Sequence, residues 1–426
     1  PDLSGERFSG LSPISYARAI ADREGLPWVV VQHGAKVRVH PARVGVGVGR
    51  RGRTETYVEC HAGLLPDSDA IRRRLAERVG ASGVDAFSLL SSVGRDCVGA
   101  LQFVPEGEDP GSMEEIRGRP LTSKDVADLL RNLAAQPLGL SKDADFRISL
   151  AGAQEKTALL FHKGRWQKPV GATPTTHILK PIIGRLPNGL DLTHSVENEY
   201  LCMLVTRALG LPTARVAIAD FGDQHALVIE RFDRLWTKDG RLLRLPQEDL
   251  CQALAVPPTR KYEAEGGPSM LDVLNLLKES DTPREDQERF LRAQVVFWMI
   301  GATDGHGKNF SIFLSPGGRF HLTPLYDVLS VLPNFAAGQI RRNQIKLAMA
   351  VGDRRHYAIS TIQPRHFVQT AKRAGLSEVF VEEVIDELGR RIPEAIQRVR
   401  GELPADFPTM VSGPILEALN HRAVRR

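Results

Sequence analysis

The chain contains 426 residues, 42% of them hydrophobic and 25% charged, with a net charge of +5. This composition is typical of a soluble globular protein of two or three domains. No apolar run has the length of a membrane span. The small excess of basic residues is compatible with an anionic partner but does not require one. The four cysteines lie far apart without CxxC spacing and the first residues lack a secretory signal, so we expect no zinc site, no disulfide framework and a cytoplasmic location.

The N-terminal part of the chain has a mixed pattern. Residues 1–59 include "HPARVGVGVGRRGRTETY", which is rich in Gly, Arg and Val and predicts a flexible strand or loop. The run "LLPDSDAIRRRLAERVG" predicts a helix with Asp67 or Ser68 as its N-cap. Residues 97–105 alternate like a strand, and residues 122–136 predict a second capped helix.

The segment from residue 146 to residue 235 has a mainly β pattern, with one helix over about 193–209. "FRISL" and "KTALLF" predict two strands joined by the small-residue turn "AGAQ", and "THILKP", "ARVAIADF" and "HALVIERFDR" predict three more. Beyond residue 247 the pattern is mostly helical, and only "FSIFL" and "RFHLTPL" predict a short β pair. This order predicts an α+β protein with a β-rich lobe followed by a helical lobe.

The loop "GATDGHGKNFS" concentrates polar residues between two apolar runs. Asp304 and Asn309 have the D-x-x-x-x-N spacing of a kinase catalytic loop, in which the carboxylate orients the attacking hydroxyl and the amide oxygen binds Mg²⁺. Asp327, just after the following strand pair, is a second oxygen ligand that can converge on the same ion. The alternatives are a helix C-cap at Gly301 or Gly305 followed by a turn, and an N-cap role for Asp327.

Three further features precede this loop. Lys180 ends an apolar face of "THILKP", from which its ammonium can reach nucleotide phosphates and pair with Glu199 of the next helix; a surface lysine is the alternative. The small residues of "AGAQEK" would let backbone N–H groups approach phosphates, or they form a simple hairpin turn. "VIERFDR" ends a buried strand at which an interlobe hinge could hold an adenine edge. The order of these features is that of a bilobed kinase.

With these motifs in this order, the chain resembles the HipA family, the serine/threonine kinase toxins of HipBA toxin–antitoxin modules. The matching stretches include "GLLPDS", "VGRDCVGAL", "DFRISLAGAQEKTALL", "TPTTHILKP", "ERFDR", "RLPQEDLCQ", "GATDGHGKNFS" and "LTPLYDVLS", and they cover roughly residues 60–426. The resemblance implies a bilobed protein-kinase-like fold, with a β-rich N-terminal lobe over 60–245 and an all-helical C-terminal lobe over 246–426. Residues 1–59 do not resemble the family's small N-terminal β subdomain and form an atypical segment.

The resemblance also implies a role for each matching residue. Asp304 is expected to be the catalytic aspartate, and Asn309 and Asp327 the ligands of Mg²⁺. Ser149 matches the serine whose autophosphorylation disables these enzymes, while a strand-end hydroxyl bonded to the backbone is the structural alternative. The expected contacts to ATP are Ala151, Gly152, Ala153, Gln154, Glu155, Lys156, Lys180, Glu230, Arg231, Phe232, His306, Gly307, Lys308, Asn309, Tyr326 and Asp327.

The implied partners are a helix-turn-helix antitoxin, operator DNA bound through the toxin–antitoxin complex, and glutamyl-tRNA synthetase as the protein substrate. Lys372 matches one of two basic positions that contact DNA, whereas the other falls on Gly375, so that Arg373 would have to replace it. A serine/threonine protein kinase toxin is therefore the leading hypothesis. A non-catalytic nucleotide-binding co-repressor and a small-molecule kinase are the alternatives, and a pure co-repressor would need none of the kinase residues.

Overall fold

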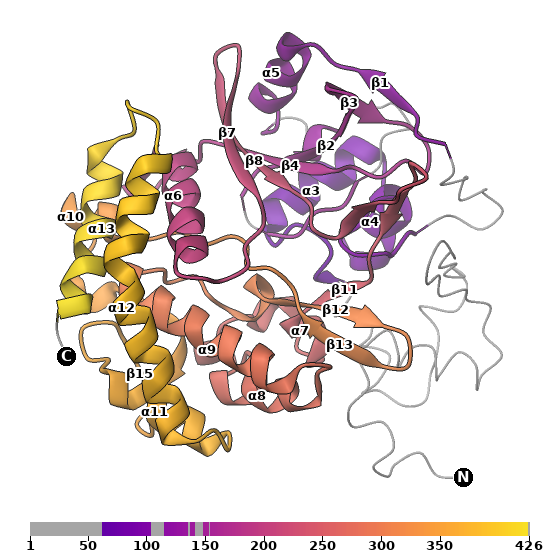
Figure 1. Cartoon of the computed structure of the whole chain (residues 1–426). Helices are drawn as coiled ribbons and strands as arrows, with labels where there is room; N and C mark the ends of the chain where they lie inside the picture. Colours follow the sequence, from indigo (N-terminus) through magenta and orange to yellow (C-terminus); the bar gives the residue numbers. More distant parts are fainter. Residues whose placement is uncertain (1–61, 104–114, 135–136, 141–147, 153, 425–426) are drawn as a thin grey trace, which may run out of the picture.

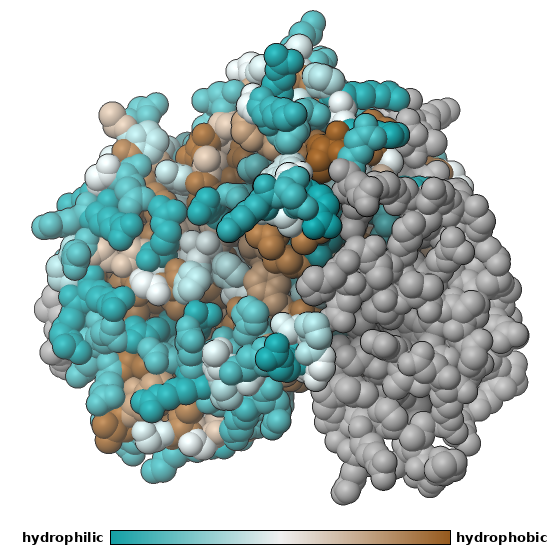
Figure 2. Space-filling view, turned by 45° about the vertical axis from the view of Figure 1, so that its right-hand side comes forward, coloured by the Kyte–Doolittle hydropathy of each residue, from teal (hydrophilic) through white to brown (hydrophobic). Residues whose placement is uncertain are grey.

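The computed structural model describes residues 62–103, 115–134, 137–140, 148–152 and 154–424. They form an α+β fold of two lobes, as predicted (Figure 1). The atypical N-terminal segment, residues 1–59, lies outside the described residues. None of the helices in the described ranges is long and apolar enough to cross a membrane. On the face shown in Figure 2, hydrophilic side chains cover most of the described surface and hydrophobic ones appear between them, as on most protein surfaces.

The N-terminal lobe is built on a six-stranded sheet with the order β1-β3-β2-β4-β8-β7, in which every neighbouring pair is antiparallel. Helices α3, α4 and α5 lie on one side of it, and α6 lies between the sheet and the C-terminal helices (Figure 1). The elements of this lobe are α3 (Asp69–Val79), α4 (Ala86–Val93), β1 (Gly118–Pro120), α5 (Ser123–Arg131), β2 (Thr157–His162), β3 (Arg165–Pro169), β4 (His177–Pro181), β5 (Gly184–Arg185), β6 (Asp191–Leu192), α6 (Ser195–Ala208), β7 (Val216–Phe221), β8 (Gln224–Glu230), β9 (Arg234–Trp236) and β10 (Leu242–Arg244).

Strand β8 shows how the sheet separates two hydrophobic cores. Val228 belongs to the core beneath α3, α4 and α5, whereas Leu227 and Ile229 pack into the core shared with α6 and the helical lobe. The separation follows from the alternation of side chains along a strand. Ser68 caps α3 and Thr122 caps α5, so both helices predicted in this part of the chain are confirmed with their caps.

The C-terminal lobe packs its helices around α9, whose residues are buried nearly all round. Its elements are β11 (Gln247–Asp249), α7 (Leu250–Ala253), α8 (Met270–Leu276), α9 (Pro283–Ile300), β12 (Ser311–Ser315), β13 (Arg319–Leu322), α10 (Leu332–Ala336), β14 (Lys346–Val351), β15 (His356–Ala358), α11 (Pro364–Arg373), α12 (Glu378–Glu402) and α13 (Thr409–Val424). The predicted pair β12–β13 is confirmed. The lobe is not all-helical, however, because β11 joins this pair and β14 pairs with β15.

Two strands predicted in the N-terminal lobe do not form in the described residues. Residues 97–103 make turns and irregular backbone. Gly99 has a left-handed φ of 75°, and its N–H donates to the carboxylate of Asp233, at 2.7 Å, rather than to a neighbouring strand. The alternating pattern of this segment therefore reflects burial against the hinge region and not a place in a sheet.

The second of these is "FRISL", whose described residues 148–150 have no regular secondary structure and join no sheet. The N–H of Ser149 donates to the carbonyl of Asp96 instead of to a strand partner. The turn "AGAQ" is consequently not a hairpin, and Gly152 forms an isolated parallel bridge with Pro66. The loop is thus held by the segment that precedes α3, which places it over the cleft between the lobes.

Candidate active site

One cavity of about 950 Å³ lies between the two lobes. The N-terminal lobe contributes the end of β4, the loop before β2 and the end of β8, and the C-terminal lobe contributes the two loops that flank β12 and β13. Most residues predicted for the site line this cavity: Ala151, Gly152, Gln154, Lys156, Lys180, Glu230, Arg231, Phe232, Asp304, His306, Lys308, Asn309, Tyr326 and Asp327. Residues more than a hundred positions apart in the sequence therefore meet in one place.

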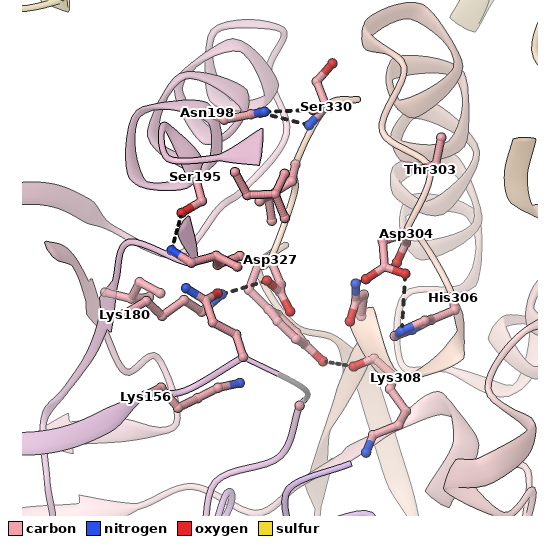
Figure 3. Close-up of a pocket in the computed structure, with 18 of the residues that line it drawn as sticks. Lys156, Lys180, Ser195, Asn198, Thr303, Asp304, His306, Lys308, Asp327 and Ser330 are labelled. Carbon is pink, nitrogen blue, oxygen red and sulfur yellow. Dashed lines mark hydrogen bonds and ion pairs between the residues drawn. The ribbon is translucent and has the colours of Figure 1, made fainter. Parts of the chain in front are cut away.

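Lys180 is the central cation of the cleft (Figure 3). Its Nζ lies 2.8 Å and 3.0 Å from the two carboxylate oxygens of Glu199 in α6, which confirms the predicted pair. It also lies 2.6 Å from Oδ1 of Asp327. Burial raises the pKa of Glu199 to about 7, since the charge of Lys180 offsets only part of the cost of removing the carboxylate from water.

The catalytic-loop residues follow the end of α9. Gly301 ends the helix in the left-handed conformation, with φ 67°. The Nδ2 group of Asn309 donates to the carbonyl oxygen of Asp304, at 2.6 Å, so the short loop is closed on itself. The carboxylate of Asp304 is 51% exposed and accepts a hydrogen bond from the hydroxyl of Tyr262. Nε2 of His306 lies 3.7 Å from the same carboxylate, and burial lowers the pKa of this imidazole.

Asp327 has a backbone φ of 59°, a conformation that non-glycine residues rarely adopt and that occurs most often at functional sites. Burial alone would raise its pKa, but Lys180 and Lys156 lower it to about 2, so the side chain is ionised. Carboxylate and amide oxygens are suitable ligands for Mg²⁺, which commonly takes one or two protein oxygens together with phosphates and water. Asp327 and Asn309 line the same cavity, and the hydrogen bond from Nδ2 of Asn309 leaves its amide oxygen as the ligand atom, so the pair fits such an ion.

The predicted nucleotide loop carries a buried lysine. Nζ of Lys156 donates to the carbonyl oxygen of Ala151, at 2.6 Å, across the turn of the loop. Gly152 lies between them with φ 106°, and a Cβ at this position would come within 2.3 Å of the Lys156 ammonium. Burial and the neighbouring Lys180 lower the pKa of Lys156 to about 8. Among the described contacts, Lys156 has no carboxylate within hydrogen-bonding distance. The loop therefore presents a cation that is not already paired with an acidic side chain.

The predicted hinge is fixed by hydrogen bonds to buried residues of the N-terminal lobe. The N–H of Arg231 donates to the carbonyl of Thr176, and its guanidinium bonds to Asp233 and Asp96. Phe232 contacts the ring of Tyr326 at 5.6 Å between centroids and so forms an apolar wall of the cleft. The backbone of the hinge is therefore fixed beside a flat apolar surface.

Other predicted residues lie outside the cavity. Glu155 forms an ion pair with Arg74, and Gly307 packs against the cleft from behind, where a Cβ would meet Pro268 at 2.8 Å. Ser149 is fully buried, and its hydroxyl donates to the carbonyl of Leu64 at 2.7 Å. Lys372 and Arg373 lie in the last turn of α11, away from the cleft, and Ala153 is outside the described residues.

Several residues of the site were not predicted as site residues, although Asp67 and Asp249 lie within the matching stretches "GLLPDS" and "RLPQEDLCQ". Tyr262 bonds to Asp304, Asp67 bonds to Lys261 and Lys308, and Asp249 lines the cavity beside β12. Burial raises the pKa of Asp249 to about 6. Asp67 precedes the N-cap of α3, Asp249 ends β11 and caps α7, and Tyr262 lies between short 3-10 turns; at such positions neither periodicity nor motif spacing distinguishes a site residue from a surface one.

Comparison with known proteins identifies the family of the chain. Residues 148–396 match the family model of the HipA-like C-terminal domain, and residues 49–104 match that of the HipA N-terminal domain. Y4mE of Sinorhizobium fredii, which its name classes among the kinases, is 36% identical over 79% of this chain and 77% of its own length. The serine/threonine-protein kinase toxin HipA of Shewanella oneidensis is 29% identical over 80% of this chain and 76% of its own length.

The fold agrees with a solved relative as well. The chain is similar to the Shewanella oneidensis HipA in a structure with HipB and operator DNA, with a TM-score of 0.72, 26% identity, and coverage of 93% of each chain. The C-terminal family model alone covers more than half of the sequence, including the nucleotide loop, the catalytic loop and Asp327. The chain therefore belongs to the HipA-like family of serine/threonine kinase toxins, and it is a kinase.

Proposed function

We propose that this kinase uses Mg-ATP to phosphorylate serine or threonine in proteins and acts as the toxin of a toxin–antitoxin module. The convergence of Lys180, Asp304, Asn309 and Asp327 on one cavity is the observation that carries the proposal. These four side chains are the phosphate clamp, the base and the two metal ligands that phosphoryl transfer requires. A co-repressor without catalytic activity would have no need to bring them together.

The nucleotide would occupy the half of the cleft beneath β2, β4 and the loop before β2. The adenine edge would meet the hinge backbone from Glu230 to Phe232, with the ring of Phe232 against it. Lys156 and Lys180 are the cations available for the phosphates, and Gly152 allows backbone N–H groups to approach them. Asp327 would have to exchange its contact with Lys180 for the metal, while Glu199 keeps hold of Lys180.

Asp304 is placed to accept the proton of the attacking hydroxyl, because its carboxylate is half-exposed to the cavity and oriented by Tyr262. Mg²⁺ bound by Asn309 and Asp327 would neutralise charge on the phosphates. His306, whose pKa is lowered by burial, stays largely neutral beside Asp304 and so does not compete as a cation for the γ-phosphate. Together these side chains orient the acceptor and hold it for in-line transfer.

The rest of the cleft supports a protein acceptor rather than a small molecule. Beyond Asp327 the cavity continues along the β5–β6 hairpin, α10 and the start of α13. Its apolar lining there includes Leu186, Val331, Pro333 and Met410. A nucleotide would leave this half free, and an extended segment with apolar side chains beside its hydroxyl residue would fit it.

Ser149 is proposed as an autophosphorylation site that turns the kinase off. Its hydroxyl is buried and bound to Leu64, so the segment around it must leave its place before the hydroxyl can reach the γ-phosphate. A phosphate of charge near −2 could not return to the same position, because its acceptor oxygens would face the carbonyl of Leu64. Modification would thus keep the nucleotide loop out of the cleft.

The partners are proposed from the relatives. The solved Shewanella structure contains HipB and operator DNA, which supports a helix-turn-helix antitoxin and DNA-bound repression for this chain as well. The exposed Lys372 and its neighbour Arg373 are the candidate contacts to the DNA backbone, and replacing both by Ala should reduce the salt dependence of operator binding. Glutamyl-tRNA synthetase is the proposed substrate on the family resemblance, and a cytoplasmic location is proposed with it.

The decisive experiment is intact-mass spectrometry of dephosphorylated protein after incubation with Mg-ATP. The unsubstituted chain should gain about 80 Da, the mass of one phosphate, mapped to Ser149. Asp304→Asn should gain nothing, whereas Asp406→Asn, an exposed aspartate outside the cleft, should gain as much as the unsubstituted chain. If no protein is phosphorylated, including purified glutamyl-tRNA synthetase added as acceptor, the toxin proposal fails and the co-repressor or small-molecule alternatives replace it.

A further inference from the structure

The segment before α3, residues 63–68, lies where the N-terminal lobe meets both loops of the active site. Leu64 and Leu65 are buried in the core of that lobe, and Ser68 caps α3. From the second turn of α3, Arg72 donates from Nε to the carbonyl of Pro66 at 2.6 Å and from Nη2 to that of Ala62 at 3.0 Å. The segment is therefore firmly anchored, and anything it binds is held in a defined place.

The backbone of this segment holds the nucleotide loop. The N–H of Asp67 donates to the carbonyl of Gly152, at 3.1 Å, and Pro66 forms a β-bridge with the same glycine. Two residues before Pro66, the carbonyl of Leu64 accepts a hydrogen bond from the hydroxyl of Ser149 at 2.7 Å. The loop over the cleft is thus attached to residues 64–67 by main-chain groups.

The side chain of Asp67 holds the opposite lobe. Its Oδ1 lies 2.6 Å from Nζ of Lys308 in the catalytic loop, and its Oδ2 lies 2.8 Å from Nζ of Lys261. Lys308 also donates to the carbonyl of Gly63 at 3.2 Å. In Figure 3 the ammonium of Lys308 points away from Asp304 and Asp327, consistent with its contacts to residues 63–68. Lys308 therefore anchors the catalytic loop in this conformation instead of facing the reacting groups.

Lys261 connects Asp67 to the surroundings of Asp304, the proposed base. It precedes Tyr262, whose hydroxyl bonds to Asp304, and its carbonyl accepts the N–H of Gly307 at 3.3 Å. Burial alone would raise the pKa of Asp67, but Lys308 and Lys261 hold it well below its usual range. Without the carboxylate, two ammonium groups, one of them 3% exposed, would face each other with no anion between them.

We propose that Asp67 is a positioning residue for phosphoryl transfer, which ties Lys308 and Lys261 of the catalytic side to the nucleotide loop and so holds Asp304 at the correct distance from the bound phosphates. This role rests on the proposed function of the site. It requires no contact between Asp67 and the substrate. It also assigns two tasks to one residue: the backbone serves the nucleotide loop, and the side chain serves the catalytic loop.

This division predicts a specific kinetic result for Asp67→Asn. The substitution keeps the N–H that binds Gly152, so the KM for ATP should change by less than about threefold, whereas kcat should fall by about tenfold to a hundredfold because the catalytic loop is displaced. All proteins carry Ser149→Ala to prevent self-modification, and transfer to purified glutamyl-tRNA synthetase, the proposed substrate, is measured with ATP as the varied substrate. The matched control is Asp69→Asn, an exposed aspartate two residues further along, which should behave like the parent.

The outcomes separate this role from a structural one and from the proposed function itself. A fall in kcat of less than about threefold overturns the positioning role. A fall in kcat/KM that comes from a raised KM for ATP overturns it as well. If Asp67→Asn does not fold, Lys261→Gln takes its place, since it removes one of the two contacts; it should lower kcat severalfold, and an unchanged kcat overturns the role. A parent protein without any transfer would instead contradict the proposed function, and the role with it.

Discussion

Two groups of buried charges, one within the N-terminal lobe and one at the junction of the two lobes, differ in how many hydrogen-bonding partners the protein supplies to each of them. We call Asp96, Arg231, Asp233, Arg234 and Arg244 the hinge cluster, and Lys180, Glu199 and Asp327 the cleft cluster. In the hinge cluster, every carboxylate and guanidinium is at most 6% exposed. In the cleft cluster, the side chain of Asp327 is 31% exposed and opens into the cavity.

Each carboxylate of the hinge cluster accepts several hydrogen bonds. Asp96 accepts from the three arginines of the cluster and from Thr175, and Arg231 and Arg234 also donate to the carbonyl of Cys97. The arginines hold the pKa of Asp96 well below its usual range although burial opposes this. Such a cluster stabilises one structure. A cluster that shares one lysine between two carboxylates and faces a cavity can exchange a partner for a ligand, as phosphoryl transfer requires.

The largest effect that would test this contrast is on the cleft cluster. Asp327→Asn should lower the rate of phosphate transfer by about a thousandfold, or about 4 kcal/mol, because the metal loses its carboxylate ligand. The free energy of unfolding should change by less than about 1 kcal/mol, since Lys180 keeps Glu199. Transfer assays and urea unfolding measure the two, with Asp406→Asn as the control. Loss of stability in proportion to activity would show that the cleft cluster is structural too.

The opposite result is expected for the hinge cluster. Asp96→Asn should lower the free energy of unfolding by about 3 to 5 kcal/mol, because it leaves three buried guanidinium groups without their shared carboxylate. Urea unfolding measures this, with Asp128→Asn as the control: its exposed pair with Arg131 should contribute less than about 1 kcal/mol. An Asp96→Asn protein of unchanged stability would remove the distinction between the clusters.

Next in size is a pH effect in the cleft cluster. The pKa of Glu199 rises from 4.5 to about 7 on folding, so the folded state favours its neutral form. The resulting stabilisation is complete below pH 4.5 and is lost as the pH rises through 7, an amount on the order of 3 kcal/mol. Over that range the unsubstituted chain should therefore lose stability relative to Glu199→Gln, which cannot titrate. Parallel curves of unfolding free energy against pH would contradict the shift.

The smallest predicted effect concerns the orientation of the base. Tyr262→Phe removes the hydroxyl that bonds to Asp304, so kcat should fall by about tenfold, the equivalent of about 1.4 kcal/mol for one hydrogen bond to a charged group. The KM for ATP should stay the same, because Tyr262 lies on the catalytic side of the cleft. Tyr357→Phe, a hydroxyl bound to exposed Arg355, is the control. Equal kcat values for the two variants would show that Asp304 needs no such support.

Much of the site followed from local sequence. The side-chain alternation of strand β4 and the position of Glu199 in the next helix predicted the pair with Lys180, which the structure confirms. The spacing of Asp304 and Asn309 predicted a kinase catalytic loop, and the structure adds the 2.6 Å hydrogen bond from the amide of Asn309 to the carbonyl oxygen of Asp304. Of the strand expected at 146–150, the described residues 148–150 join no sheet, because alternating apolar residues indicate burial, and these residues are buried without a sheet partner. The roles of the individual site residues stay predictions until the variants are measured.

Capping residues, strand alternation and motif spacing act over a few positions, so the sequence by itself predicted most of the longer helices, the strands β2, β4, β7, β8, β12 and β13, and the residues proposed for phosphoryl transfer. Only the tertiary structure decided which charges meet. Asp67 and Lys308 are 241 positions apart, and Lys180 and Asp327 are 147 positions apart, so no local pattern records either contact. Ion pairs of this kind depend on the packing of one lobe against the other. Burial removes the charges from water, and only then does the energy of a charge depend strongly on which partner lies beside it.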